Sequence, residues 1–504
     1  KIWRYIMKGF GVDFGTTNSI AAFYDHKIKK VQPLLSSEMS PHPSIVWYKA
    51  DGTIIVGHDA KKNIMGFSNV EGNEFVSSIK RRLGKGHSLS IFGQKKSVSE
   101  VATEIFRHLK EHAQGENVQL NNVIVTVPVY FNGQQRRELR KAADDAGLYI
   151  KTFIHEPFAA IVGYCYREGS GISLDGMQNQ LIIVFDWGGG TLDITLVQVL
   201  DGELRELATS GLEDKAGDYF DEKLSRFAKS GFIDYLRARP NEINLSPGNI
   251  GRLLTECERA KKNLSEIESE TIQVAQFCRY DGSYHHLKQP VRRNDFENLI
   301  NNDIKDAIAE VNKVLETANV RSNEIDIAIL IGGSSRIPLI KESLRKMFGY
   351  RIVEMKNADT IIAEGAAIID ALNLQPIMAR DLCAELSDGT DFEIFKSGVF
   401  ASPETCKKKV HFYCTDNRDG VAKLVIKEHT GRIHATRPLT KNVLSIPVSS
   451  EIPKPYNHER VVVDFALDRD MVLHVSGKGA TQNQNAKCEI FDLCFGLSIS
   501  GANL

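Results

Sequence analysis

The sequence predicts an α/β protein with two related lobes that face one another, followed by a separate all-β domain. The first observation is a repeated pattern. "GVDFGTTNSIAAF" (11–23) and "VFDWGGGTLDITLV" (184–197) each place an aspartate and glycines between two β-type runs. Such a pattern is typical of a hairpin with a tight turn. The second observation is an alternation of strand-like and helix-like segments up to about Leu374, and the third is its replacement by short β-rich pieces beyond that point.

The alternating segments follow one another in the order expected of an α/β fold. "NNVIVTVPVYF" (121–131) is β-branched and predicts a strand, and 133–148 then carries helix formers with a glycine near its end. "IDIAILIGGSS" (325–335) predicts a buried strand that runs into glycines. The helix predicted over 337–349 has a proline in its first turn and a glycine at its end. Ligands bind at the strand ends in this pattern.

The β-rich remainder contains no long stretch of helical periodicity. Its β-type pieces are "KKVHFYC", "GVAKLVIKEH", "NVLSIPVSS", "RVVVDFAL" and "MVLHVSG". Turn-rich stretches such as "TDNRDG" and "PKPYNHE" separate them. Short alternating strands joined by turns predict a compact antiparallel β domain.

Composition excludes several classes of function. The 504 residues carry a formal net charge of -1, so no global field attracts nucleic acid or an anionic membrane. No apolar run approaches the ~20 residues of a membrane helix, and the first residues lack the features of a secretory signal. The eight cysteines are scattered without a C-x-x-C pair or zinc spacing. We expect them to be free, structural thiols in a reducing compartment, which predicts a cytoplasmic protein.

The two hairpin turns predict a phosphate site. A glycine-rich turn lets peptide N–H groups approach a phosphate, because no Cβ intervenes. Asp13 and Asp186 would meet phosphate only with Mg²⁺ between them, so we expect them to hold the metal through water. The hydroxyls of Thr16, Thr17 and Thr191 would reach phosphate oxygens. The alternative, a plain hairpin with an Asx turn, is disfavoured because the pattern occurs twice and "IGGSSR" adds a third glycine turn.

Six motifs in order carry a resemblance to a known family. They are "GVDFGTTNS", "VTVPVYFN", "FDWGGGTLDI", "CERAKKNLS", "IGGSSRIP" and "ADTIIAEGAA". They resemble the seventy-kilodalton heat-shock chaperone family, within the actin and sugar-kinase superfamily. The resemblance implies a two-lobed actin-like ATPase domain of duplicated ribonuclease-H-like lobes over 7–372 and a linker over 373–380. It implies a β-sandwich that binds peptide over 381–504, without a full helical lid.

The resemblance also implies roles for individual residues. The implied catalytic residues are Lys80, Glu156, Asp186, Thr191 and Asp193. The implied nucleotide-binding residues are Gly15, Thr16, Thr17, Asn18, Gly188, Gly189, Gly190, Glu258, Lys261, Lys262, Ser265, Gly332, Gly333, Ser334, Arg336 and Asp359. Pro128 and Arg136 match a relay that passes the nucleotide state to the linker. Without the resemblance, Lys80 would be a solvated surface lysine and 258–265 a charged helix face.

Several positions depart from the family pattern. Lys262 stands where an adenine-stacking arginine is usual, and an ammonium stacks less well than a guanidinium. Ala216 replaces the first of two glycines, and Ala358 replaces a proline. His155 and Trp187 are also unusual. None of these changes removes a metal-binding or phosphate-binding group, so we still expect binding of ATP or ADP with Mg²⁺.

The linker and the end of the chain depart further. The family has an acid-flanked leucine run, whereas "LNLQPIMARDLCAEL" here carries Pro376, Arg380 and Asp381. Coupling between nucleotide state and peptide affinity is therefore an open question at the level of sequence. The residues after "HVSGKGA" are too few for a multi-helix lid. Within them, "CEIFDLCFGLSI" would either complete the sandwich or cover the peptide groove.

The sequence thus favours an ATP-dependent chaperone for unfolded or extended peptides. By resemblance, its further partners would be a J-domain co-chaperone and a nucleotide-exchange factor, with no nucleic acid and no membrane. A small-molecule kinase of the same superfamily is the first alternative, and the all-β remainder argues against it. The second is a nucleotide-sensing scaffold with weak or no ATPase, whose β domain binds one dedicated partner. The unusual linker and the missing lid favour that alternative.

Overall fold

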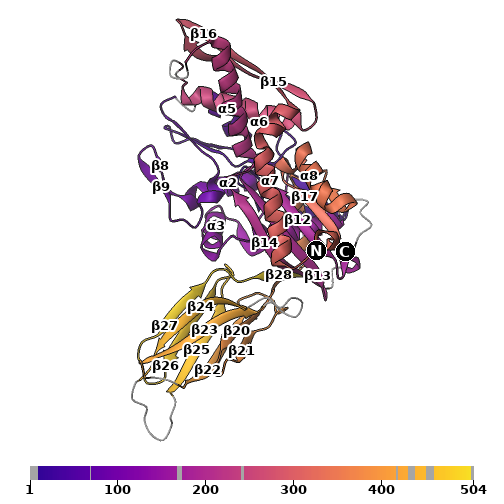
Figure 1. Cartoon of the computed structure of the whole chain (residues 1–504). Coiled ribbons are helices and arrows are strands. Elements are labelled where there is room, and N and C mark those ends of the chain that lie inside the picture. Colours follow the sequence, from indigo (N-terminus) through magenta and orange to yellow (C-terminus); the bar gives the residue numbers. More distant parts are fainter. Residues whose placement is uncertain are drawn as a thin grey trace.

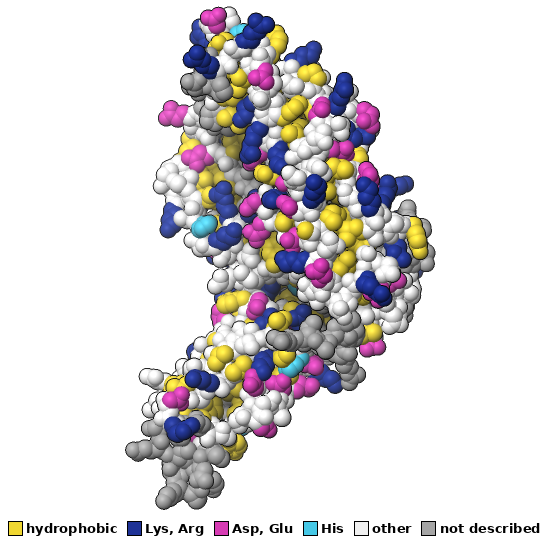
Figure 2. Space-filling model, in the orientation of Figure 1, with side chains coloured by type: hydrophobic (Ala, Val, Ile, Leu, Met, Phe, Trp, Pro, Cys, Tyr) yellow, Lys and Arg dark blue, Asp and Glu magenta, His cyan; other side chains and the backbone are white. Residues whose placement is uncertain are grey.

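The computed structural model consists of a large α/β part and a β-rich part that meet at a narrower waist (Figures 1 and 2). The structure describes residues 9–67, 70–166, 173–239, 243, 245–415, 418–429, 438–449 and 459–500. On the face shown in Figure 2, basic and acidic side chains are intermixed. No described helix is both long and apolar enough to cross a membrane.

The α/β part contains two large sheets, each of which defines a lobe. In lobe I the strand order is β11-β10-β1-β2-β3, with β4 also paired to β2. These strands are β1 (Gly9–Phe14), β2 (Asn18–Asp25), β3 (Lys30–Leu34), β4 (His42–Pro43), β10 (Asn122–Val127) and β11 (Tyr149–His155). In lobe II the order is β18-β17-β12-β13-β14-β28-β19. These strands are β12 (Leu181–Trp187), β13 (Thr191–Leu200), β14 (Glu203–Glu213), β17 (Ile327–Ile331), β18 (Ile352–Glu354), β19 (Pro376–Met378) and β28 (Phe495–Ser498).

The two repeated motifs form equivalent hairpins at the centres of these sheets. The β1–β2 pair is antiparallel, and β1 also pairs in parallel with β10, where Asp13 lies opposite Thr126. The β12–β13 pair is antiparallel, and β12 also pairs in parallel with β17, where Asp186 lies opposite Ile331. Each turn therefore lies at the carboxyl end of a parallel strand pair, which is the edge where α/β sheets bind ligands.

Two apolar helices, α4 (Glu156–Tyr166) and α9 (Ile361–Ala371), pack against each other beside these sheets. Because α4 is apolar and buried along nearly its whole length, its first residue, Glu156, is held in the interior. Further helices cover the two lobes (Figure 1). They are α1 (His58–Phe67), α2 (Val98–Gly115), α3 (Gly133–Asp145), α5 (Gly217–Leu236), α6 (Pro247–Leu264), α7 (Arg293–Thr317) and α8 (Pro338–Phe348).

Smaller sheets extend each lobe beyond its central sheet. In the first half of the chain they are β5 (Val46–Lys49), β6 (Ile54–Val56), β7 (Asn73–Val76), β8 (Ser88–Ile91) and β9 (Gln94–Ser97). A long hairpin of β15 (Ser269–Tyr280) and β16 (Ser283–Arg292) lies beside α5 and α6 at the top of Figure 1. Helix α3 begins with a capping box between Asn132 and Gln135, which fixes the start of a helix that later contacts the β-rich part.

The β domain, strands β20 to β27, is built from two four-stranded antiparallel sheets. One sheet is ordered β21-β20-β23-β24 and the other β22-β25-β26-β27. The strands are β20 (Asp381–Glu385), β21 (Asp391–Phe395), β22 (Lys407–Cys414), β23 (Val421–His429), β24 (Leu439–Pro447), β25 (Glu459–Leu467), β26 (Leu473–Gly479) and β27 (Ala486–Ile490). Buried and less buried residues alternate along β25, as expected for a strand with one face on a core.

The secondary structure confirms the elements predicted from the sequence. Both hairpins, the strand and helix after residue 121, and the strand and helix after residue 325 are present, and so are the five β-type pieces. The chain is therefore a mixed α/β protein, as predicted. All eight cysteines are free in the structure, and six of them are buried.

The last described strand differs from the two alternatives considered for it. Of "CEIFDLCFGLSI", only the first part joins the β domain, as β27 paired with β26. The second part, β28, crosses back to lobe II, where it pairs with β14 and with the linker strand β19. The boundary predicted at 381–504 therefore assigns to the β domain a strand that lies in the sheet of lobe II.

Candidate functional site

A cavity of about 550 Å³ lies between the two hairpin tips, and residues of both lobes line it. The structure brings most of the predicted site residues together here. They are Asp13, Gly15, Thr16, Thr17, Asn18, Lys80, Pro128, Glu156, Asp186, Gly188, Gly189, Gly190, Thr191, Asp193, Gly332, Gly333 and Asp359. These residues come from segments scattered over most of the chain, so the cavity is a product of the tertiary fold.

The close approach of the two tips explains the run of three glycines. A Cβ added to Gly189 would lie 2.1 Å from Thr17 Oγ1, and one added to Gly190 would lie 2.7 Å from Thr16 Cγ2. Real Cβ atoms do not come this close to other heavy atoms, so side chains on these glycines would push the lobes apart. The Thr17 hydroxyl is buried and has no hydrogen-bond partner among the described residues. An oxygen-rich ligand in the cavity would satisfy it.

One buried ion pair crosses the floor of the cavity. Lys80 lies on the short helix η1 (Ile79–Arg82), and its Nζ donates to Glu156 Oε1 at 2.7 Å. Burial alone would lower the pKa of Lys80, but the carboxylates of Glu156 and Asp13 outweigh it and raise the pKa. Lys80 is therefore a fixed positive charge inside the site.

The aspartates around this pair are costly to ionise. Burial and the charge of Glu156 raise the pKa of Asp13 to about 6, although Lys80 and a hydrogen bond from Thr126 oppose the shift. Burial and Glu156 also raise the pKa of Asp193 to about 7. Burial and the neighbouring carboxylates raise the pKa of Asp186 well above its ordinary value. A cluster of desolvated carboxylates with one lysine favours an additional cation.

Four residues predicted to bind nucleotide, Glu258, Lys261, Lys262 and Ser265, do not line this cavity. Helix α6 carries Glu258, Lys261 and Lys262 and ends at Ser265. Lys261 Nζ donates to Gly217 O at 2.7 Å and to Asp221 Oδ2 at 2.8 Å, so it braces α5 against α6.

The third glycine turn supports its neighbours by two contacts. Ser334 Oγ donates to Gly188 O at 2.8 Å, which ties this turn to the second hairpin. Arg336 pairs with Asp359 at 2.9 Å at the surface. Ser334 and Arg336, predicted to bind nucleotide, therefore support the walls around the site without lining the cavity itself.

Sequence reasoning missed two pairs that bridge the lobes. The Arg81 guanidinium donates to Gly190 O and lies 3.0 Å from Asp214. Lobe I therefore contacts the second hairpin directly. Lys61 Nζ of α1 lies 2.8 Å from Glu258 of α6. In the sequence, only its position next to Lys80 pointed to Arg81, and no motif pointed to Lys61.

Two of the unusual residues have structural roles. The Trp187 side chain is fully buried against Phe185 and Phe220, and its indole donates to Lys215 O at 2.9 Å. Lys262 is exposed and pairs with Glu258 at 2.7 Å. Trp187 thus anchors the second hairpin to the apolar core of lobe II.

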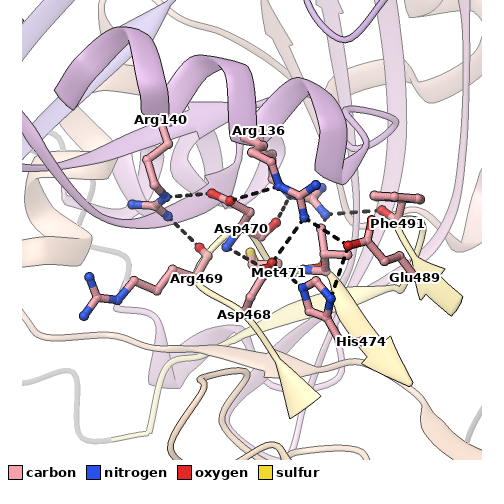
Figure 3. A network of polar contacts seen from close by, with 11 residues as sticks. Arg136, Arg140, Asp468, Arg469, Asp470, Met471, His474, Glu489 and Phe491 are labelled. Carbon is pink, nitrogen blue, oxygen red and sulfur yellow. Dashed lines mark hydrogen bonds and ion pairs between the residues drawn. The ribbon is translucent and has the colours of Figure 1, made fainter. Parts of the chain in front are cut away.

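Helix α3 of lobe I holds the β domain through arginines (Figure 3). The buried Arg136 donates to the carbonyl oxygens of Asp470 at 2.7 Å and Met471 at 3.2 Å. It also donates to Phe491 O at 3.3 Å. Arg140 adds an ion pair with the Asp470 carboxylate at 2.6 Å. Arg136, predicted as a relay residue, therefore lies in the contact between the domains, while Pro128 lines the cavity.

A second hollow, of about 900 Å³, opens in the β domain. Apolar side chains of the strands and polar loop residues share its lining. The apolar lining residues include Leu386, Phe412, Tyr413, Val421, Ala422, Leu424, Ile446, Val461 and Val463. Sequence reasoning did not name these residues, because no local motif marks which faces of the strands meet at the hollow.

Fold and site together define a mixed α/β protein with a polar cleft between two lobes and a docked β domain. The family model described as Hsp70 protein matches residues 87–493, which is most of the chain. The chain therefore belongs to the Hsp70 family, and the resemblance drawn from its motifs is confirmed. Members of this family are in general ATP-dependent chaperones that bind ATP or ADP with Mg²⁺ and bind unfolded peptides and co-chaperones. The match begins after Lys80 and ends before β28.

Proposed function

We propose that this chain is an ATP-dependent molecular chaperone that hydrolyses MgATP between its lobes and binds extended peptide in its β domain. The two lobes are then the actin-like halves of an ATPase domain. The observation that carries the proposal is the cavity in which both glycine-rich tips meet the Lys80–Glu156 pair and the aspartates Asp13, Asp186 and Asp193. Free, largely buried cysteines fit the reducing cytoplasm.

Different residues of the chain would bind the phosphates, stabilise the developing charge and orient the attacking water. Peptide N–H groups of the hairpin turns and the Thr17 hydroxyl would bind phosphate oxygens. Lys80 would stabilise the charge that develops on the transferring oxygens, and Glu156 holds its ammonium in place. Asp193, which accepts a hydrogen bond from Thr191 at 2.8 Å, would orient the attacking water. Closure of the lobes through Arg81 would exclude bulk water.

The carboxylate cluster fits a magnesium ion. No group of three or more His, Cys, Asp or Glu in the described ranges is arranged to hold a metal by itself. Mg²⁺ usually takes one or two carboxylates together with substrate phosphates and waters. Asp13 and Asp186 would hold it through water, and the ion would neutralise charge on the phosphates. Their raised pKa values fit this assignment, because a cation would stabilise the ionised carboxylates.

The hollow of the β domain suits an extended apolar peptide. Main-chain hydrogen bonds from strand edges would supply affinity, and the apolar lining would select side chains. Arg136 and Arg140 on α3 would report the state of lobe I to the β domain through Asp470. A J-domain co-chaperone and a nucleotide-exchange factor complete the proposed set of partners.

The proposal is tested by measuring MgATP turnover and the affinity for a fluorescent apolar peptide in ATP and in ADP. We expect turnover, and affinities that differ at least about threefold between the two nucleotides. Tyr413→Ser should weaken peptide binding and leave turnover intact, because Tyr413 is 65% exposed at the hollow. The matched control is Tyr350→Ser, in which an exposed tyrosine far from the hollow is changed. Absence of turnover would refute the ATPase, and equal affinities would refute the coupling.

A further inference from the structure

Strand β28 joins the domains by a route separate from the linker. It lies between β14 of lobe II and the linker strand β19, and it pairs with both. Ser498 N donates to Gln375 O at 2.9 Å, and Ala379 N donates to Cys494 O at 3.1 Å. The strand lies outside the residues that match the family model. It is therefore a feature of this chain whose role the family match does not supply.

The apolar side chains of β28 enter two different cores. Phe495 belongs to the apolar cluster that runs from lobe I into the β domain. Leu497 of β28 and Ile499, just after the strand, belong to the cluster that contains Leu204 and Phe158 of α4. All three side chains are almost completely buried. Strand β28 thus packs between lobe I, lobe II and the linker. Because the packing is tight, a movement of either lobe or of the linker must displace β28 or the residues that contact it.

Phe495 meets the residue that precedes the catalytic glutamate. Its ring lies 6.5 Å from the ring of His155, edge to face, while Phe158 stacks on His155 at 5.7 Å. His155 is buried, and its Nδ1 has no hydrogen-bond partner among the described residues. Burial and the nearby Arg136 lower the pKa of His155 to about 3, so the ring is neutral. Packing of its two aromatic neighbours therefore does much to fix its orientation.

His155 ends β11, and Glu156 begins α4 directly after it. A displacement of the His155 backbone would therefore pass through one peptide bond to the residue that carries the Glu156 carboxylate, whose oxygen holds Lys80 at 2.7 Å. We infer that Phe495 is a positioning residue for the Lys80–Glu156 pair, acting through His155, and that β28 conveys the docking of linker and β domain to the site. The kinetic consequence rests on the proposed ATPase function; the positioning of the pair does not.

The first test needs no nucleotide. Hydrogen exchange is measured on the full chain for the parent, Phe495→Ala and Ile490→Ala. Ile490 is as buried as Phe495 but lies at the end of β27, and it serves as the control for a lost apolar side chain in the β domain. We expect faster exchange around 79–82 and 153–158 in Phe495→Ala only. Equal exchange in Phe495→Ala and the parent at these segments, or the same change in Ile490→Ala, would overturn the inference.

The second test separates positioning from binding. Phe495→Ala should lower kcat for MgATP about tenfold and leave KM within about twofold, because a small displacement of a catalytic pair costs rate rather than ground-state affinity. Phe495→Leu, which keeps most of the apolar volume, should recover part of the loss. An unchanged kcat in Phe495→Ala would contradict the positioning role. If the parent shows no turnover while exchange responds as expected, the proposed function fails and the positioning of Lys80 and Glu156 remains.

Discussion

The two hairpin tips share a backbone pattern but differ in their electrostatic surroundings. In lobe I, Asp13 lies close to the Lys80 charge and accepts a hydrogen bond from Thr126, which limits its pKa to about 6. In lobe II, burial and the carboxylates of Glu156, Asp193 and Asp13 raise the pKa of Asp186 well above its ordinary value, although Lys80 opposes the shift. Both tips therefore lie near the Lys80 charge, but the tip of lobe II carries two raised-pKa aspartates, Asp186 and Asp193, and the tip of lobe I carries one. Under the proposed function, lobe II therefore has the greater need for a bound cation.

The tips differ in their sterics as well. A Cβ on Gly15 would lie 2.0 Å from Asn18 O within its own turn. A Cβ on the equivalent Gly188 would meet nothing nearer than Thr191 O at 3.9 Å. In lobe I, Gly15 is required by the backbone of its own turn. In lobe II, Gly189 and Gly190 are required because Thr17 and Thr16 of the opposite lobe lie close to them. Similar motifs thus meet different physical requirements in the two halves.

Lys80→Ala removes the cation that lowers the pKa of the aspartates at both tips, and we expect the largest effect from this change. Turnover of MgATP should fall by about 10²–10³-fold, as when a preorganised charge is lost from a transition state. Nucleotide should still bind, because the glycine turns remain. Single-turnover kinetics and calorimetry check the two parts. Lys141→Ala, at an exposed lysine of α3, is the control, and turnover in Lys80→Ala equal to that of the control would contradict the assignment.

Gly15→Ala and Gly188→Ala compare the two turns directly. Gly15→Ala should lower the free energy of unfolding by about 2 kcal/mol or more, because the new methyl collides with backbone that cannot move aside. Gly188→Ala should change it by less than about 1 kcal/mol. Urea denaturation measures both. Equal losses in the two variants would show that the steric difference between the tips is not real.

The hairpins and the strand–helix pairs could be predicted because turn chemistry and periodicity are local properties. The convergence of Asp13, Asp186 and Lys80 followed from the family motifs. Strand β28 could not be predicted, since "FGLS" suits a β-sandwich edge and the edge of lobe II equally well, and only the long-range path of the chain decides. Pairs such as Lys61–Glu258 were also hidden, because surface charges at helical spacing do not reveal their partners.

The raised pKa values of the site predict a dependence of stability on pH. Burial and the charge of Glu156 raise the pKa of Asp193 from 3.8 to about 7 in the fold, so between these pH values the folded chain binds more protons than the unfolded chain. The free energy of unfolding should therefore fall as pH rises from about 4 to about 7. MgATP should reduce this fall, because the cation stabilises the ionised carboxylates. Denaturation at about pH 5 and about pH 8, with and without MgATP, tests this.

Asp193→Asn provides the matched control for that experiment. The fall in stability with rising pH should be smaller in this variant, because the substitution removes one carboxyl group whose pKa is raised in the fold. A parent whose stability rises through the same range, or a variant with an unchanged slope, would contradict the electrostatic comparison of the two tips.

Lys61→Ala should give the smallest effect. The Lys61–Glu258 pair spans the two lobes but is partly exposed, with side-chain exposures of 26% and 19%. Exposed pairs contribute at most about 1 kcal/mol, so ADP should dissociate roughly two- to fivefold faster. Stopped-flow release of a fluorescent ADP measures the rate. Lys62→Ala, which removes a pair with Glu38 inside lobe I, should leave the rate unchanged. If ADP dissociated at the same rate from both variants, the Lys61–Glu258 pair would have no role in closing the lobes.

Titration calorimetry of the parent and of Asp186→Asn with MgATP, and with ATP in the presence of a chelator, tests most directly that the two tips bind a magnesium-bound triphosphate. We predict that the parent binds MgATP at least about tenfold more tightly than metal-free ATP, a difference of about 1.4 kcal/mol, and that Asp186→Asn loses most of this preference. No heat with MgATP, or the same affinity with and without the metal, would contradict the account.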